Sequence, residues 1–285
     1  MKGRSVVAVG GGHGLAVTVR ACQTWATELT AVVSVADDGG SSGRLRRAAP
    51  GLPAVGDLRR CVTSLAATRH SALAAALERR PTVDELAGHP PGNLLLAALV
   101  DEVGDLESAA AVLGAALGVT ATVVPATTEP VELVGLTGGG AEIVGQVAVE
   151  SAGGICDVRL EPPDPEVSKS AVAALAGLGP DDLVVLGPGS FLGSVLAALA
   201  PPRLGAAIRA SVARRVLVHN LFSPSPVAER LRLLAEHGVP VDVVVVQAGQ
   251  AGLGELGDEV VQADVARDNG LAHDVERLAA VLQGL

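Results

Sequence analysis

Residues 5–14 read SVVAVGGGHG, an apolar, β-branched run followed directly by a turn rich in glycine. The run predicts a buried strand over 5–9, because β-branched residues favour extended backbone. Glycines at a strand-to-helix turn let the backbone approach a phosphate, and the helix N-terminus adds N–H groups and a favourable dipole. The turn is neither GxGxxG nor a Walker A loop, so a merely tight turn is the alternative. Its candidate phosphate-binding residues are Gly10, Gly11, Gly12, His13 and Gly14.

Short apolar runs continue to alternate with Ala- and Leu-rich helical stretches along the chain. The predicted strands are 5–9, 31–35, 120–124, 183–186, 215–218 and 241–247. The predicted helices are 14–27, 56–68, 92–103, 105–117, 166–177, 190–199, 203–212, 225–237 and 273–283. Wholly apolar strands that alternate with helices are typical of a parallel sheet covered on both faces. We therefore predict a Rossmann-like, doubly wound, mostly parallel α/β fold in one domain over 1–285.

One segment, about 130–160, departs from this alternation. Residues 131–136 and 141–149 alternate apolar and polar positions around a TGGG turn, which predicts an inserted antiparallel hairpin. Residues 155–160 are a candidate third strand, and the hairpin is expected at an edge of the main sheet or as a flap on it. The proline-containing segment 161–170 predicts a connector between the two α/β halves.

Composition excludes several classes of protein. The chain has 285 residues, a hydrophobic fraction of 49% and a formal net charge of −10. A net acidic chain does not suit a broad phosphate-neutralising surface, and three aromatic residues are too few for base-stacking platforms, so we expect no nucleic-acid partner. No apolar run approaches the length of a membrane span. Three cysteines without CxxC spacing argue against disulfides or zinc and predict a cytoplasmic protein. The aromatic residues are Trp25, Phe191 and Phe222.

Carboxylates, glycines and arginines follow the second predicted strand in ADDGGSSGRLRR, 36–47. A carboxylate here binds ribose hydroxyls in dinucleotide folds, so Asp37 and Asp38 are candidates for that role or for holding Mg²⁺. Five of the chain's 21 Lys and Arg residues fall between 44 and 60, which predicts a specific anionic ligand. A polar surface loop with helix-capping aspartates is the alternative. The GGSSG segment predicts a nest of backbone N–H groups that binds an anion, and the arginines add positive charge. The further candidates are Gly39, Gly40, Ser41, Ser42, Gly43, Arg44 and Arg59.

A second glycine-rich turn, GPGSFLGS at 187–194, follows strand 183–186. Its candidate phosphate- or hydroxyl-binding residues are Gly187, Gly189 and Ser190, with a tight turn and a serine cap as the alternative. Asn93 follows PPG as either a helix cap or an amide that binds a base or ribose. Asn220 ends strand 215–218, where ligands of α/β sheets bind. No set of His, Cys and carboxylate residues has zinc spacing, and no catalytic triad can be assigned, so we name no catalytic residue.

Several strings resemble one family when they are taken in order. They are GGGHGL at 10–15, VADDGGSSGRLR at 35–46, GDLRRC at 56–61, PGNLLLAAL at 91–99, LTGGGAEIVGQ at 136–146 and VVLGPGS at 184–190. With the ending ADV…HDVERLA they resemble the YvcK-type proteins of the CofD-like superfamily, over 5–282. The resemblance implies a Rossmann-like gluconeogenesis factor that binds UDP-N-acetylglucosamine and supports cell shape and peptidoglycan precursor supply. The CofD branch of 2-phospho-L-lactate transferases instead moves a phospholactyl group from a guanosine diphosphate carrier to a deazaflavin, with Mg²⁺.

The resemblance also implies which positions line the nucleotide site. These are the loop 10–14, Asp37 and Asp38, the segment 39–44, Asn93, the GPGS turn and Asn220. The chain departs from the family pattern at three places. His13 replaces a usual threonine, Ala272 stands where a basic residue is common, and 221–229 lacks a usual carboxylate and hydroxyl. The last two departures bear on the sugar half of the ligand, whereas the positions for the diphosphate match.

Three functions are weighed on this basis. The first is a regulatory UDP-N-acetylglucosamine-binding protein that requires no cofactor, acts on cell-wall precursor enzymes and forms a homodimer. The second is a CofD-type transferase in which Asp37 or Asp38 holds Mg²⁺. The scarcity of aromatic rings argues against its deazaflavin acceptor. The third, an NAD(P)-dependent oxidoreductase, lacks its GxGxxG turn. We therefore expect a UDP-sugar whose diphosphate lies over 10–14 and 39–44.

Overall fold

A seven-stranded parallel sheet forms the centre of the molecule, which a computed structural model describes over residues 3–83, 86–222, 226–250 and 259–285. The strand order is β10-β9-β8-β7-β1-β2-β3. The order therefore reverses between β1 and β7, the kind of switch point at which open α/β sheets bind ligands. The strands are β1 Ser5–Gly10, β2 Glu28–Val33, β3 Thr122–Pro125, β7 Leu183–Leu186, β8 Arg214–Val218, β9 Val243–Gln247 and β10 Glu259–Ala263.

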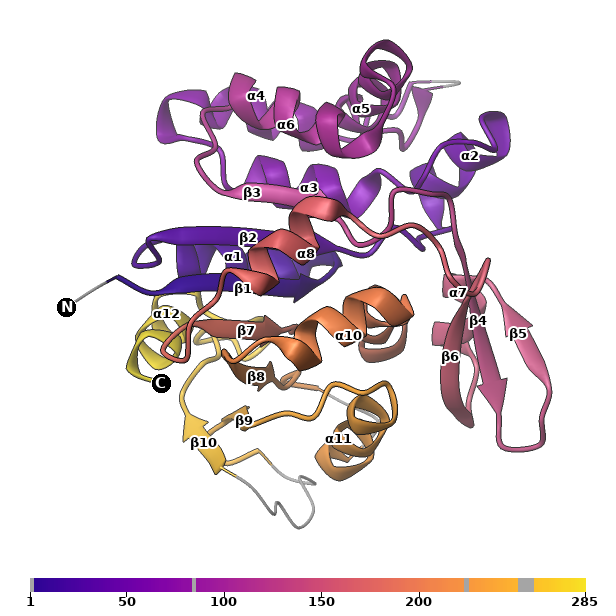
Figure 1. The fold of residues 1–285 in the computed structure, drawn as a ribbon. Helices are drawn as coiled ribbons and strands as arrows, with labels where there is room; N and C mark the ends of the chain where they lie inside the picture. The colour runs from indigo at the N-terminus through magenta and orange to yellow at the C-terminus, as the bar shows by residue number, and fades with distance from the viewer. Residues whose placement is uncertain (1–2, 84–85, 223–225, 251–258) are drawn as a thin grey trace.

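Helices cover both faces of this sheet (Figure 1). On one face α1, Gly12–Gln23, packs between α3, Gly56–Ser64, and α12, Val275–Gly284. On the other face α8, Lys169–Ala176, packs against α10, Pro202–Ala210. The remaining helices are α2 Gly40–Ala48, α4 Ser71–Glu78, α5 Pro91–Val103, α6 Leu106–Ala116, α7 Gln146–Ser151, α9 Ala197–Leu199 and α11 Val227–Glu236, with the short turns η1 Thr68–His70 and the π-helical η3 Phe191–Leu196.

This arrangement explains the apolar strands and confirms the predicted fold class. Val6 to Val9 are at most 1% exposed because helices exclude water from both faces of β1. The predicted strand boundaries shift by up to three residues. The elements that were not predicted include α2, α4 and the edge strand β10, Glu259–Ala263. The residues of β10 are partly or fully exposed and lack the continuous apolar run of the central strands.

The inserted hairpin is confirmed, but it belongs to a separate three-stranded antiparallel sheet of order β5-β4-β6. Its strands are β4 Glu132–Thr137, β5 Glu142–Val144 and β6 Ile155–Glu161. The predicted strand over 141–149 was wrong beyond Val144, because Gly145 takes a positive φ of 102° and α7 begins at Gln146. On α7, which lies between β5 and β6 in the chain, the Val147 N–H donates to Asp38 Oδ1 at 3.0 Å and so ties the inserted segment to the loop after β2.

Among the described residues, no single helix has the length and apolar character needed to cross a bilayer. The bent pair Phe191–Leu199 and Pro202–Ala210 has enough of both only when its two helices are taken together.

Candidate functional site

The two glycine-rich turns pack directly against each other at the switch point. Gly187 N–H donates to the Val9 carbonyl at 2.9 Å, and Thr18 on α1 donates its hydroxyl to the Gly187 carbonyl at 2.7 Å. Gly14 approaches the second turn so closely that a Cβ there would lie 2.1 Å from the Pro188 carbonyl oxygen. Glycine at position 14 is therefore what allows the first turn of α1 to pack on the second glycine turn.

A cavity of about 560 Å³ opens above these turns, a size typical of small-molecule sites. Eight of the residues predicted from the sequence line it: Gly11, Gly12, His13, Gly14, Asp37, Gly189, Ser190 and Asn220. The structure adds residues that were not predicted, among them Asp57, Arg60, Gln146, Glu150, Ser194 and His273. Gly10 and Gly187 stand at the strand ends beside the lining residues.

Asp57 and Arg60 form a charged pair at one side of the cavity. Asp57 Oδ2 accepts the Gly12 N–H at 2.7 Å, and Asp57 Oδ1 accepts from Arg60 Nη1 at 2.7 Å. Burial raises the pKa of Asp57, the nearby Asp37 raises it further, and Arg60 opposes both effects. The first turn of α1 is thus held by a carboxylate, and the N–H groups of His13 and Gly14 remain without a backbone or side-chain acceptor in the described chain.

The lining of the cavity is acidic. Among the described residues it carries the carboxylates of Asp37, Asp57 and Glu150 and one guanidinium, that of Arg60. Burial lowers the pKa of His13 and of His273, with Arg60 adding to the effect at His13, so both imidazoles are neutral near pH 7. A diphosphate entering this cavity alone would face more negative than positive charge.

Asn220 holds the second glycine turn in place. Its side-chain oxygen accepts the Gly189 N–H at 3.0 Å, and its Nδ2 donates to the Gly189 carbonyl at 2.7 Å. Ser190 caps the following helical turn by accepting the Gly193 N–H at 3.3 Å. The predicted serine cap is therefore present, and both side chains also lie at the cavity wall.

The loop after β2 differs from the expected nest. Residues from Gly40 onward form the first turns of α2, a helix that was not predicted. A Cβ at Gly43 would lie 1.8 Å from the Asp38 carbonyl oxygen, which shows how tightly this turn packs on itself. The structure does not bring Asp38, Gly39, Gly40, Ser41, Ser42, Gly43, Arg44, Arg59 or Asn93 to the cavity lining.

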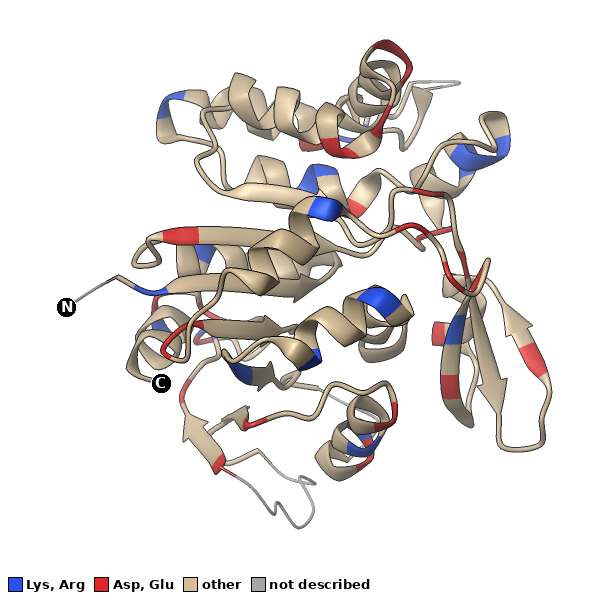
Figure 2. Ribbon diagram, viewed as in Figure 1, with Lys and Arg blue, Asp and Glu red and all other residues tan. Residues whose placement is uncertain are grey.

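The predicted basic cluster is divided between two helices. Arg44, Arg46 and Arg47 lie on α2 and Arg59 and Arg60 on α3, and Figure 2 shows basic residues on both. Arg44 donates to the Ala87 carbonyl at 2.7 Å. The amino-acid sequence alone does not reveal this division, because it depends on how α2 and α3 pack.

Arg59 is buried in a polar network instead of facing a ligand. Arg59, 1% exposed, donates to Glu78 through Nε at 2.8 Å and Nη2 at 3.0 Å, and through Nη1 to Asn93 Oδ1 at 2.5 Å. Asn93 in turn donates to Ser41 Oγ at 2.9 Å, and Ser41 is 2.8 Å from His89 Nδ1. This network joins α2, α3, α4 and α5 beside the cavity.

Comparison with known proteins now decides the family. A family model described as "2-phospho-L-lactate transferase CofD" matches residues 6–281. The chain belongs to the CofD family. It is 39% identical to a Mycobacterium tuberculosis protein named "Putative gluconeogenesis factor", over 98% of this chain and 90% of that protein. It is 33% identical to the "Gluconeogenesis factor" of Halalkalibacterium halodurans, over 86% of this chain and 78% of that protein.

Solved structures agree with this assignment. The crystal structure of a UPF0052-family member from Bacillus halodurans superposes on this CofD-family chain with a TM-score of 0.91 and 29% sequence identity, and the match covers 99% of each chain. The sequence-based resemblance and the predicted α/β fold are therefore both confirmed.

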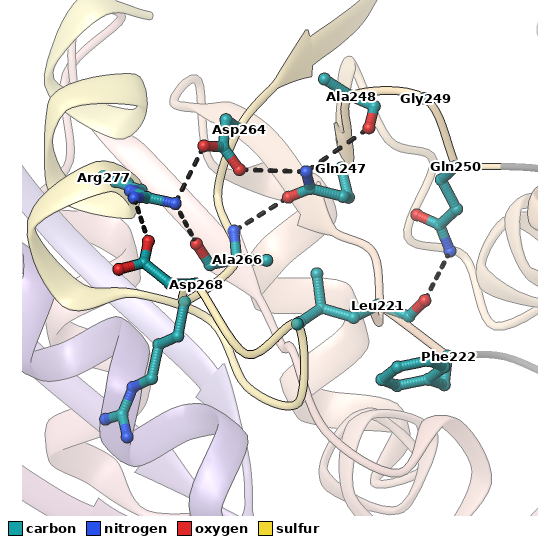
Figure 3. Close-up of a pocket in the computed structure, with 12 residues that line it drawn as sticks. Leu221, Phe222, Gln247, Ala248, Gly249, Gln250, Asp264, Ala266, Asp268 and Arg277 are labelled. Carbon is teal, nitrogen blue, oxygen red and sulfur yellow. Dashed lines mark hydrogen bonds and ion pairs between the residues drawn. The ribbon is translucent and has the colours of Figure 1, made fainter.

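A larger hollow of about 960 Å³ lies beside the ends of β9 and β10 in this CofD-family chain (Figure 3). Its polar side chains largely engage one another. Arg277 pairs with Asp264 at 2.9 Å and Asp268 at 2.6 Å, and Gln247 Oε1 accepts the N–H groups of Val265 and Ala266. None of the glycine turns lines it. We therefore place the candidate site in the smaller cavity at the switch point.

Proposed function

We propose that this CofD-family chain binds UDP-N-acetylglucosamine in the cavity between the two glycine turns and acts as a regulator that links gluconeogenesis to peptidoglycan precursor supply and cell shape. The convergence of turns 11–14 and 188–190 on one cavity supports this most strongly, because both follow the carboxyl ends of adjacent parallel strands, where α/β folds bind phosphates. The names of its relatives support the link to gluconeogenesis. We further propose a cytoplasmic homodimer that acts on cell-wall precursor enzymes.

In this proposal the diphosphate lies over the first turn of α1. Asp57 already occupies the Gly12 N–H, so the N–H groups of His13 and Gly14 are the donors toward a phosphate oxygen. Asn220 keeps the second turn in position from the opposite wall. The dipole at the start of α1 adds to the attraction for the anion.

The acidic lining leads us to propose that Mg²⁺ enters with the nucleotide. Within the described residues, no group of three His, Cys, Asp or Glu side chains could hold a metal by itself. Mg²⁺ is commonly bound by one or two carboxylates together with substrate phosphates, and Asp37 and Asp57 are close enough for Asp37 to raise the pKa of Asp57. These two aspartates would hold the ion, which would screen the diphosphate from the acidic wall.

Calorimetric titration with UDP-N-acetylglucosamine, GDP and NAD tests the ligand and the ion together. We expect saturable binding of the UDP-sugar in Mg²⁺ and an affinity lower by on the order of tenfold in EDTA, because the diphosphate then meets unscreened carboxylates. Asp37→Asn should reduce the dependence on Mg²⁺. Saturable binding of GDP without binding of the UDP-sugar would contradict the proposal.

Arg60 and Arg44 form a matched pair of arginines for testing the place of the diphosphate. Arg60→Met should weaken binding by about 1.5–3 kcal/mol, since it removes the one guanidinium in the cavity wall. Arg44→Met should leave the affinity unchanged, because Arg44 contacts the Ala87 carbonyl outside that wall. Equal losses in the two variants would remove the diphosphate from this cavity.

A CofD-type transferase is the second candidate function, favoured by the description of the matching family model. Asp37 and Asp57 would then hold Mg²⁺ beside the guanosine diphosphate carrier of the phospholactyl group. Of the two phenylalanines, Phe191 is 7% exposed, which leaves Phe222, 68% exposed, as the ring at the cavity available to stack on a deazaflavin. Turnover of a phospholactyl-guanosine donor with a deazaflavin acceptor would establish this function in place of the first.

A further inference from the structure

Arg230 is a buried cation with no acidic partner in the described part of the chain. It lies on α11, is 4% exposed, and its guanidinium carbon is 4.9 Å from the centre of the Phe191 ring. Its Nε has no hydrogen-bond partner there, and the ion pairs of the described residues do not include it. A buried charge normally has a hydrogen-bonded counter-charge, so this arginine needs an explanation.

Arg59 is also a buried arginine, but it has the hydrogen-bonded partners that Arg230 lacks among the described residues. Arg59 is buried to a similar degree and is saturated by Glu78 and Asn93. Burial lowers the pKa of Arg230 to about 10, an effect that neighbouring Glu229 partly offsets, so the side chain remains charged near pH 7. The stacked face of Phe191 compensates only part of the lost hydration.

Arg230 lines a small pocket that adjoins the main cavity. The pocket measures about 250 Å³, too small for a whole ligand but large enough for one anionic group. It shares Glu150, Ser190 and Asn220 with the main cavity, and its apolar walls include Ile155, Leu192 and Leu233.

Two carboxylates also line this pocket, and neither pairs with Arg230. Glu150 is exposed and accepts from Gln146 Nε2 at 2.6 Å. Glu150 Oε1 lies against Gly193, where a Cβ would be 2.0 Å away. Glu229 is half-buried and precedes Arg230 on α11. Neither carboxylate therefore accounts for the buried charge of Arg230, whose Nε has no hydrogen-bond partner among the described residues.

We propose that Arg230 binds an oxyanion, a carboxylate or a phosphate, on the part of the ligand beyond the diphosphate. The inference rests on the proposed function for the position of the diphosphate, because Ser190 and Asn220 join the two spaces. The planar fork of a guanidinium matches both oxyanions through paired hydrogen bonds. The site would thus bind a nucleotide sugar that carries an acidic group more tightly than a neutral one, and UDP-N-acetylglucosamine, whose sugar is neutral, would bind in the main cavity without using this pocket.

The matched ligands UDP-glucuronate and UDP-glucose, which differ by a carboxylate in place of a hydroxymethyl group, test this preference by calorimetry. The wild-type chain should bind the acidic ligand more tightly, by on the order of tenfold. In Arg230→Met this ratio should fall to about one. Arg232→Met is the control, since Arg232 lies on the same helix but is exposed and pairs with Glu236 at 2.5 Å, and it should keep the wild-type ratio.

Thermal unfolding separates a binding role from a structural one. Arg230→Met should melt at the wild-type temperature or above it, because the substitution removes a buried charge that pairs with no acidic residue of the described chain. A clear fall in melting temperature, or an unchanged ratio of affinities in Arg230→Met, would overturn the proposal.

If neither UDP-sugar binds, the proposed function is contradicted. Free anions then test the anion site at Arg230 by itself. Inorganic phosphate or acetate, at matched ionic strength, should then raise the melting temperature of the wild-type chain and not that of Arg230→Met. A rise with acetate alone would identify the group as a carboxylate, and a rise with phosphate alone as a phosphate. Equal responses of both proteins, or no response, would remove the anion subsite.

Discussion

Gly14→Ala is expected to destabilise the fold by about 3 kcal/mol and to abolish ligand binding. The new Cβ would lie 2.1 Å from the Pro188 carbonyl oxygen, 2.4 Å from its carbon and 2.7 Å from the Gly189 nitrogen. These are backbone atoms, and the turn that holds them is fixed by hydrogen bonds to Val9 and Thr18. Because the clash cannot be relieved by a rotamer change, the two turns must separate.

Urea unfolding of Gly14→Ala and Gly138→Ala measures this effect against a matched substitution. Gly138 lies in the TGGG turn, has no atom within 4 Å of its would-be Cβ and has no positive φ. Its alanine variant should unfold at the wild-type midpoint and bind the UDP-sugar as before. A Gly14→Ala variant as stable as Gly138→Ala would mean that the packing of the two turns does not set the shape of the cavity.

These contacts show why the glycine turns could be predicted from the sequence. Each turn follows a continuous apolar strand, and a strand buried on both faces belongs to the interior of an α/β sheet. The order of β1 and β7 then brings their carboxyl ends together. Residues 11–14, 189, 190 and 220 consequently reached the same cavity.

The loop after β2, residues 36–47, could not be placed in the same way, because its aspartates and arginines could equally bind a ligand or contact other parts of the protein. Asp38 looks like a ligand-binding carboxylate, yet it accepts the Val147 N–H of α7, a helix between β5 and β6 whose position no local pattern predicts. Arg59 and Arg60 are neighbours in sequence, but one side chain is buried under α5 and the other faces the cavity. The direction of each side chain depends on how α3 packs, which is a tertiary property.

The second large effect is expected for Glu78→Ala, which should destabilise the fold by breaking the buried network around Arg59. Removing Glu78 leaves Arg59, 1% exposed, without its counter-charge. It also removes the nearest acceptor of the Thr63 hydroxyl, at 2.6 Å. Breaking a buried ion pair by deleting one partner costs about 3–5 kcal/mol, and the partial exposure of Glu78 reduces our expectation to about 2–4 kcal/mol. Glu78→Gln, which keeps an oxygen acceptor, should lie between the wild type and Glu78→Ala.

The pH dependence of this loss identifies its cause. Burial by itself would raise the pKa of Glu78, but hydrogen bonds from Thr63 and Arg59 outweigh it, and the folded-state pKa lies below the ordinary value. A depressed carboxyl pKa contributes stability above its unfolded value and loses that contribution as the pH falls through the folded value. The difference in unfolding free energy between wild type and Glu78→Ala, measured by urea unfolding, should therefore be full near pH 7 and shrink below about pH 4.3.

Glu142→Ala is the control. It removes an exposed partner of Arg159 and should cost less than about 1 kcal/mol. If the two variants unfold alike, the Arg59 network does not hold α3 and α4 together beside the cavity.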